Sequence, residues 1–162
     1  MNRVKTRALG AADVRTLWEF MLEFPKHNFD DGGPRSLDQF ELAMAQRVAH
    51  EVLAAFTIED GDFVGAVAYQ PFTPRSGVLH GMCFARRVHG TGIPAEAMRG
   101  FLDGLFSDGA EKVSAQLHAD NTRAWRFFKK LGFVQEGLFR AHTTRRGELI
   151  DLRIIALCKK EN

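Results

Sequence analysis

Cysteine is scarce in this chain of 162 residues, which contains only Cys83 and Cys158. Two cysteines so far apart form neither a disulfide framework nor a metal-binding pattern. We therefore expect two reduced, mostly buried thiols, a cytoplasmic location and no bound metal. The sequence also has no apolar run long enough to cross a bilayer and no apolar stretch typical of a secretory signal, so we expect no membrane partner.

Charge of one sign is not in excess either, because 22 lysines and arginines face 20 aspartates and glutamates, for a net charge of +2. This balance does not indicate a protein that binds nucleic acid or an anionic membrane, although it permits an anionic ligand. Apolar residues make up 45% of the chain, which is enough for a buried core. We therefore expect one domain over residues 1–162.

The period of the apolar pattern changes along the chain and predicts a mixture of strands and helices. Alternating apolar residues indicate strands, and apolar residues three and four apart indicate helices. We expect strands at 3–8, 52–58, 63–69, 77–84, 113–117, 133–139 and 149–157, and helices at 14–22, 37–49, 93–105 and 124–131. The order β-α-α-β-β-β-α-β-α-β-β predicts a single α/β or α+β domain. Its mixed, mostly antiparallel sheet would have about six to seven strands and about four helices.

Capping and breaking residues set the expected boundaries of these elements. We expect Asp13 to cap the first helix and Pro71 to end the strand at 63–69. Asp60-Gly61 predicts a tight turn with both residues at positive φ. The segment 24–36 contains two prolines and two glycines and is expected to be a loop.

The most informative segment links a predicted strand to a helix that begins near Ile93 and reads Arg-Val-His-Gly-Thr-Gly over residues 87–92. Gly90 and Gly92 let the backbone approach a ligand, and the free N–H groups of the loop lie at the positive end of the helix dipole. This arrangement predicts an anion site, but a glycine turn that only starts a helix remains the alternative. The segment is not a Walker loop, because no Gly-Lys-Ser/Thr follows it.

Together with residues downstream, this loop resembles the GNAT superfamily of acyl-CoA-dependent N-acyltransferases. Residues 87–92 meet the family pattern of arginine or glutamine, two residues, glycine, one residue, and then glycine or alanine. Residues 121–133 contain the asparagine that precedes a helix ending in Leu-Gly-Phe. The continuation over residues 134–151 is similar to the Rim-type branch, the acetyltransferases of ribosomal proteins.

The resemblance implies direct transfer of an acetyl group from acetyl-CoA to a primary amine, such as a protein N-terminus, an amino sugar or a polyamine. The loop would bind the coenzyme pyrophosphate, and the pantetheine arm would enter where the strand before it splays from the next strand. A backbone N–H near Met82 or Cys83 would polarise the thioester carbonyl. The implied coenzyme-binding residues are Met82, Cys83, Phe84, Arg87, Val88, His89, Gly90, Thr91, Gly92, Ile93, Asn121 and Phe128. Dimers are common in similar proteins, so a homodimer is also expected.

Two positions depart from the family pattern and leave the catalytic groups open. Phe128 stands where the family often has a tyrosine that protonates the leaving thiolate, and Gln116 where Rim-type enzymes often have a glutamate base. His80 is our first candidate for the base and His118 our second, because an imidazole titrates near neutral pH. For each of them, a solvent-facing histidine is the alternative. Cys83 could carry an acyl group, but direct transfer favours a buried, inert thiol.

The glycine-rich loop after the first helix is expected to shape the acceptor site. Its polar residues His27, Asp30 and Asp31 would suit a cationic amine, or they belong to a solvated loop. Four aromatic residues could wall the acceptor pocket, namely Trp18, Phe20, Phe24 and Phe29. A basic rim for the 3′-phosphate of the coenzyme, or a solvated face, could be formed by Arg86, Arg87, Arg123, Arg126, Lys129 and Lys130.

Two other functions remain open. A non-catalytic acyl-CoA-binding module is favoured by the absence of both the usual tyrosine and the usual glutamate, and it would bind the coenzyme without turnover. A nucleic-acid-associated protein that reuses the fold would bind RNA or DNA with a steep dependence on salt. The net charge of +2 makes the latter the least favoured.

Overall fold

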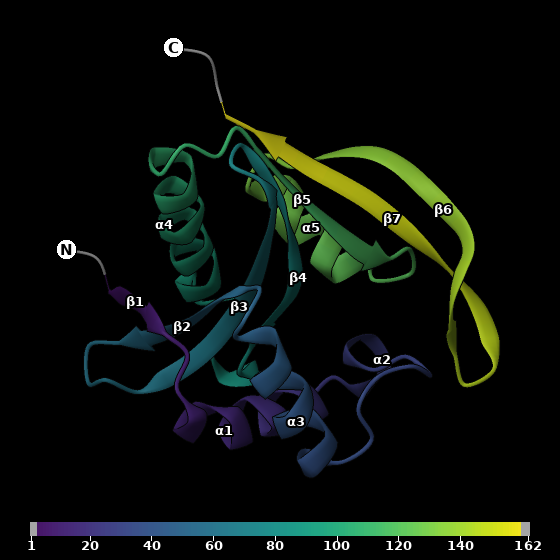
Figure 1. Ribbon diagram of the computed structural model, residues 1–162, viewed down its shortest axis with the longest axis horizontal. Coiled ribbons are helices and arrows are strands. Elements are labelled where there is room, and N and C mark those ends of the chain that lie inside the picture. Colours follow the sequence, from purple (N-terminus) through teal and green to yellow (C-terminus); the bar gives the residue numbers. More distant parts are fainter. Residues whose placement is uncertain (1–2, 160–162) are drawn as a thin grey trace.

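Seven strands form one mixed sheet in a computed structural model that describes residues 3–159 (Figure 1). The strands are β1 (Val4–Ala8), β2 (Val52–Ile58), β3 (Phe63–Thr73), β4 (Ser76–Phe84), β5 (Lys112–His118), β6 (Val134–Arg145) and β7 (Glu148–Cys158). The helices are α1 (Ala11–Leu22), α2 (Pro25–Asn28), α3 (Leu37–Arg47), α4 (Ile93–Ser107), α5 (Thr122–Lys130) and the 3₁₀ helix η1 (Arg86–Val88). The strand order is β1-β2-β3-β4-β5-β7-β6, and only β4 and β5 are parallel neighbours. The α+β domain with a mostly antiparallel sheet is therefore confirmed.

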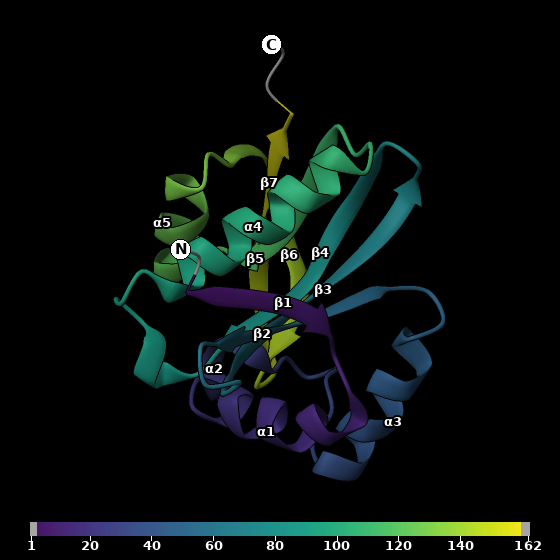
Figure 2. The same ribbon diagram turned by 90° about the vertical axis from the view of Figure 1, so that its left-hand side faces the viewer.

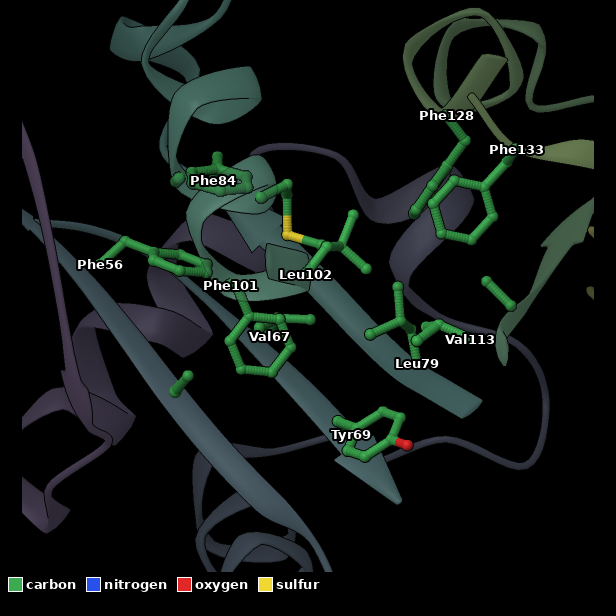
Figure 3. Packing of buried hydrophobic residues seen from close by; sticks show 14 of the residues in the cluster. Phe56, Val67, Tyr69, Leu79, Phe84, Phe101, Leu102, Val113, Phe128 and Phe133 are labelled. Carbon is green, nitrogen blue, oxygen red and sulfur yellow. The ribbon is translucent and has the colours of Figure 1, made fainter. Parts of the chain in front are cut away.

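Two apolar clusters of unequal size pack against the sheet. The ribbon shows the helices that cover it (Figures 1 and 2). Helices α4 and α5 contribute to the main cluster, in which Phe56, Met98, Val113 and Ile155 are 0% exposed (Figure 3). Helices α1 and α3 pack on the opposite face in a smaller cluster centred on Leu17 and three further buried residues, Phe40, Met44 and Ala66. Because the main cluster holds most of the buried side chains, it makes the larger contribution to stability. No helix in the described range is long and apolar enough to span a membrane.

The sheet opens between its two parallel strands. β4 and β5 pair only from Ser76↔Lys112 to Leu79↔Ala115, and no pairs follow although both strands continue. On the other side of β4, the register with β3 shifts between Ala68 and Tyr69, which leaves His80 as an extra residue in a bulge. A bulge increases the local bend of a strand. The expected splay therefore exists, and it begins at His80.

The helix boundaries differ from the prediction at the N-terminal end. Gly10 is the N-cap of α1, and Asp13 is the third residue of the helix. The Asp13 carboxylate accepts hydrogen bonds from the backbone N–H of Gly10 (2.8 Å) and from both terminal nitrogens of Arg7 (2.6 and 2.8 Å). A carboxylate in the first turn can satisfy the free N–H groups of the helix from this position, so the helix begins three residues earlier than expected. The segment 24–36 is also not entirely a loop, because it contains the short helix α2.

Three expectations about strands and thiols were wrong. β3 continues through Pro71, which pairs with Gly77 of β4. On its other side, β3 has no β2 partner beyond Tyr69, which pairs with Val52, the first residue of β2. The missing N–H of proline breaks no ladder hydrogen bond on a side without a neighbouring strand. In the turn before β3, only Gly61 has positive φ (78°), as expected for a longer loop than a two-residue turn. Cys158 is exposed because it ends β7 at the rim of the sheet.

Candidate active site

A cavity of about 450 Å³ lies at the opening between β4 and β5. On one side it is lined by these strands and α5, and on the other by α1, α3 and the segment between them. Its size is typical of ligand pockets. The fold brings six of the catalytic and coenzyme-binding candidates to this cavity. They are His80, Met82, Cys83, His118, Asn121 and Phe128. Of the other coenzyme-binding candidates, Phe84 is the last residue of β4, and residues 87–93 form the glycine loop and the start of α4.

The glycine loop is a compact turn with two backbone donors left open. Gly90 and Gly92 have φ values of 80° and 87°, which favour glycine. The hydroxyl of Thr91 donates to the carbonyl of Val88 (2.7 Å) and accepts from the N–H of Ile93 (3.3 Å). Within residues 3–159, the N–H groups of Gly90 and Gly92 have no hydrogen-bond partner. These two donors lie just before α4, where the positive end of the helix dipole favours an anion.

The structure narrows the set of backbone donors that the sequence suggested for this loop. The N–H groups of Val88 and His89 donate to the carbonyls of Ala85 and Arg86, both at 3.1 Å. They are therefore occupied by the 3₁₀ turn η1. A Cβ atom built on Gly90 would meet nothing within 4 Å, so open space lies in front of this glycine. The backbone of the loop is therefore exposed at Gly90 and Gly92 and is not covered by its own side chains.

The side chains expected to add donors to the loop are engaged elsewhere. The guanidinium of Arg87 donates to the carboxylate of Asp62 (2.7 Å) and to the carbonyl of Phe63 (3.1 Å). The His89 ring lies 2.9 Å from the carbonyl oxygen of Phe84 through Nε2. Both side chains therefore hold the loop against the sheet, and their role in binding the coenzyme stays a prediction.

Arg3 is a residue near the loop that the sequence did not suggest. Its backbone N–H and its Nε donate to Glu96 in the first turn of α4, at 2.6 and 3.1 Å. A Cβ atom on Gly92 would lie 3.4 Å from Nη2 of Arg3. The pairing neutralises the one acidic residue in the first turn of α4 and places a cation beside the loop. No local pattern reveals this contact, because it joins residues 93 positions apart.

Phe24 joins two parts of the expected basic rim. The guanidinium carbons of Arg86 and Arg123 lie 4.8 and 4.7 Å from the centre of its ring, and the His89 ring stacks on it at 4.9 Å. Cation–π contacts of this kind stabilise partly desolvated arginines. Phe24 thus connects η1 to the start of α5 across the cleft, whereas Phe20 is buried against Phe63.

His80 is exposed at the mouth of the cavity and makes one polar contact. Its Nε2 lies 2.6 Å from Oε1 of Gln70 on β3. Because the amide oxygen of Gln70 only accepts, Nε2 carries the hydrogen and Nδ1 holds the lone pair of the neutral ring. Gln116 lines the same cavity on the facing strand, one residue past the last β4–β5 pair.

His118 lies in a polar cluster at the end of β5. Its ring is 6.4 Å from that of His27, measured between centroids. Burial lowers the pKa of His118, and the positive charge of Arg145 lowers it further. Burial likewise lowers the pKa of His27. Both rings are therefore neutral near pH 7 and able to accept a proton.

Asp120 carries the negative charge of this cluster. It accepts hydrogen bonds from Arg145 and pairs with Lys26 at 3.3 Å, and these contacts hold its pKa well below the ordinary value. His27, His118 and Asp120 each place one possible ligand atom within 4.8 Å of the others. Imidazole nitrogens and carboxylate oxygens are donor types that bind transition metals. The two cations on the carboxylate weaken its attraction for a metal ion.

The two aspartates of the acceptor loop have different surroundings from those expected. Asp31 accepts from the backbone N–H groups of Arg146 (2.7 Å) and Gly147 (2.8 Å), the central residues of the β6–β7 turn. These bonds lower the pKa of Asp31 and fix the loop to the hairpin, so Asp31 is not open to an amine. Asp30 accepts from Thr143 at 3.1 Å but still lines the cavity.

The remaining candidates divide clearly by burial. Burial raises the pKa of Cys83 to about 12, so the thiol stays protonated and is a poor nucleophile at neutral pH. Phe128 is 3% exposed but lines the cavity, with its ring packed edge-on against Phe133 (Figure 3). The side chain of Phe84 points away from the cavity and stacks on Phe56, so only its backbone is available there. Tyr69, the only tyrosine, is buried in the main core.

Comparison with known proteins identifies the family. Residues 3–134 match the acetyltransferase (GNAT) domain. A relative from Bacillus licheniformis, described as an uncharacterized N-acetyltransferase p20, is 27% identical over 105 residues. The aligned part is 64% of this chain and 59% of the relative, so the chain spans less than two thirds of that protein's length.

Solved structures share the fold at low sequence identity. The spermidine N-acetyltransferase from Vibrio cholerae, in complex with CoA and spermine, has a TM-score of 0.82 at 18% identity over 98% of this chain and 96% of that one. The ribosomal-protein-S18-alanine N-acetyltransferase from Escherichia coli has a TM-score of 0.76 at 15% identity over 98% and 96%. This chain belongs to the acetyltransferase (GNAT) domain family, because the family match covers residues 3–134, well over half of the chain.

Proposed function

We propose that this chain is an N-acetyltransferase that moves an acetyl group directly from acetyl-CoA to a primary amine. The observation that carries the proposal is the combination of two unpartnered glycine N–H groups with an opened pair of parallel strands. The first binds an anion and the second exposes strand backbone for an extended ligand. A phosphate-bearing ligand with an extended amide arm fits this combination.

The residues present fit the coenzyme at three points. The N–H groups of Gly90 and Gly92 bind the pyrophosphate in the open space in front of the loop. The unpaired end of β4 bonds the amide groups of the arm. The side chain of Asn121 uses its oxygen to cap α5 (3.1 Å to the N–H of Ala124), which leaves its amide hydrogens for the arm. Bound there, acetyl-CoA supplies an activated thioester.

Two histidines are the proposed bases for the attacking amine. His118 is neutral at pH 7 and faces the cavity, so it accepts the proton directly or through a water molecule. His80 lies at the mouth of the same cavity with Nε2 bonded to Gln70, which leaves Nδ1 to accept the proton. A backbone N–H of β4 near Met82 or Cys83 polarises the carbonyl that the amine attacks.

Protonation of the departing thiolate is assigned to water. Phe128 offers no acidic hydrogen where a tyrosine often stands in the family, and the Cys83 thiol, with its pKa raised to about 12, is too weak an acid. Catalysis by this chain therefore depends mainly on positioning and on carbonyl polarisation. The alternative of a non-catalytic acyl-CoA-binding module is favoured by the same missing acid.

Calorimetry of acetyl-CoA binding tests the proposal with a matched pair of variants. Gly90→Glu places a side chain and a negative charge in the open space before the loop. Gly61→Glu makes the same change at the same backbone φ (78° against 80°), also with no atom within 4 Å of the new Cβ. We expect micromolar binding that only Gly90→Glu abolishes. No binding by folded wild-type protein would refute the proposal, and binding without acetyl transfer to any amine would favour the module.

Three finer expectations remain predictions. The Rim-type branch rests on residues 134–151 alone. A homodimer is supported by exposed apolar side chains on the β6 edge strand, among them Leu138 and Phe139 at 45% and 46% exposure. Such an edge pairs readily with another copy, and light scattering during gel filtration measures the mass. The cytoplasmic location stays an expectation from the cysteine content.

A further inference from the structure

The acceptor half of the cavity has a lining that selects a class of amine. Phe40, Ala43, Met44 and Arg47 line the cavity from α3. Their spacing of three and four residues places them on one face of the helix. At 1.5 Å per residue, this face extends for about 10 Å from Phe40 to Arg47. The cavity therefore follows α3 away from the opening between β4 and β5.

Apolar groups dominate this part of the cavity on every side. Opposite α3 it is lined by Leu17 and Met21 of α1 and by Ala66 and Ala68 of β3. The side chains of the smaller apolar cluster thus form walls as well as a core. Burial of an apolar body against such walls stabilises binding.

Charged groups occur only at the ends of this lining. Among the described residues that line the cavity, Asp30 is the only carboxylate and Arg47 the only lysine or arginine. Asp30 lies on the same segment as His27, which also lines the cavity with His118. Arg47 follows at the last turn of α3, where its Nε is 3.6 Å from a carboxylate oxygen of Glu51.

We infer that the acceptor is a primary monoamine with an apolar body, aromatic or branched aliphatic, which lies along α3 with its nitrogen toward Asp30 and His118. This inference rests on the proposed function of the same site. One ammonium group can meet Asp30 before it loses its proton. A second ammonium group would be desolvated among apolar side chains or would approach Arg47, and both arrangements are unfavourable. The lining therefore disfavours polyamines.

Acetyl transfer to a panel of amines tests the inference, with release of the coenzyme thiol as the readout. The panel contains 2-phenylethylamine, 3-methylbutylamine, spermidine, glucosamine and a peptide with a free N-terminus. We expect kcat/KM for the two apolar monoamines to exceed that for spermidine by about tenfold or more, the range typical of apolar pockets. A higher value for spermidine, glucosamine or the peptide would overturn the inference.

A pair of variants on one helix locates the effect. Ala43→Asp puts a carboxylate into the apolar wall, and Ala45→Asp makes the same change on the exposed side of α3, outside the cavity lining. We expect Ala43→Asp to lower the ratio of kcat/KM for 2-phenylethylamine over spermidine about tenfold. Ala45→Asp should leave the ratio unchanged. An equal effect of both variants would contradict the placement.

The failure of this inference is distinguishable from that of the proposed function. If acetyl-CoA binds and spermidine is the better acceptor, only the acceptor class is wrong. If no amine is acetylated, calorimetry of 2-phenylethylamine with the CoA-saturated protein decides the matter. Binding that Ala43→Asp weakens supports the pocket assignment, and absence of binding overturns it.

Discussion

Arg145 of β6 holds Asp120 with two hydrogen bonds, at 2.6 and 3.3 Å, across the end of β5. The same guanidinium is one of the charges that lower the pKa of His118. The edge strand β6 therefore influences the proposed base electrostatically, although β7 separates β6 from β5 in the sheet. This coupling makes the proton acceptor testable without removing it.

Arg145→Gln should raise the pKa of His118 toward its ordinary value. The substitution removes a repelling positive charge and releases the Asp120 carboxylate, and both changes favour the protonated imidazole. Because the pKa of His118 is lowered in the wild type, the acid limb of kcat/KM should then move to higher pH. The measurement is the pH profile of acetyl transfer together with an NMR titration of His118.

Arg140→Gln, an exposed arginine on the same strand, is the control and should leave the profile in place. If the NMR titration moves but the kinetic limb does not, His118 is not the base. His80 then becomes the candidate, and His80→Ala should remove the limb.

Phe128→Tyr should supply the acid that the site lacks. The ring lines the cavity although it is 3% exposed, and we expect a para hydroxyl to extend toward the space of the leaving thiolate. We expect kcat to increase about tenfold or more, because general acid catalysis by a placed hydroxyl contributes at least that much. Rate measurements at saturating amine check this, with Phe127→Tyr on the neighbouring position as the control outside the cavity lining. A lower kcat with an unchanged fold would show that thiolate protonation is not limiting.

The features predicted correctly from the sequence are those set by local patterns. The alternation of apolar residues gave the strands, and Gly90 with Gly92 indicated a positive-φ turn before a helix, as found. In the β6–β7 turn, which joins two of the expected strands, Arg146 and Gly147 both have positive φ (54° and 77°), as a two-residue hairpin requires.

Long-range contacts could not be predicted in this way. Asp31 was expected to face the amine because a carboxylate suits a cationic acceptor, but its partners are backbone groups 115 and 116 positions away. A hydrogen bond to a backbone N–H cannot be predicted from residue types, because every residue except proline has this group. The contact of Arg87 was unforeseen for a related reason, since its partner Asp62 lies in a turn between other strands. Side-chain direction at a loop depends on the fold that surrounds it.

Gly65→Ala should destabilise the protein by about 1–3 kcal/mol. A Cβ atom at this position would overlap the ring of Phe84 and lie 2.7 Å from the carbonyl oxygen of Cys83. Both residues belong to β4, so the strand that faces the coenzyme must shift. Urea denaturation measures the loss of free energy of unfolding. Gly100→Ala in α4, with no atom within 4 Å of the new Cβ, should instead stabilise by about 0.5–1 kcal/mol. Equal effects of the two variants would contradict the close contact at Gly65.

Asp31→Ala should separate acceptor binding from coenzyme binding. The carboxylate bonds both N–H groups of the β6–β7 turn, and its own N–H donates to the carbonyl of Thr144 at 2.9 Å. Without the carboxylate, the segment with His27 and Asp30 is less firmly held at the cavity. We expect KM for the amine to rise about tenfold, because the segment loses its two hydrogen bonds to the β6–β7 turn and becomes less ordered. The dissociation constant of acetyl-CoA should stay the same, because the glycine loop lies on other elements.

Steady-state kinetics with varied amine and calorimetry with acetyl-CoA measure the two sides of this split. Asp60→Ala, in the exposed β2–β3 turn, is the matched control and should change neither quantity. An Asp31→Ala protein with normal KM for the amine would show that the hairpin contact does not position the acceptor segment. Weaker acetyl-CoA binding in the same variant would instead show that the hairpin and the segment form part of the coenzyme site.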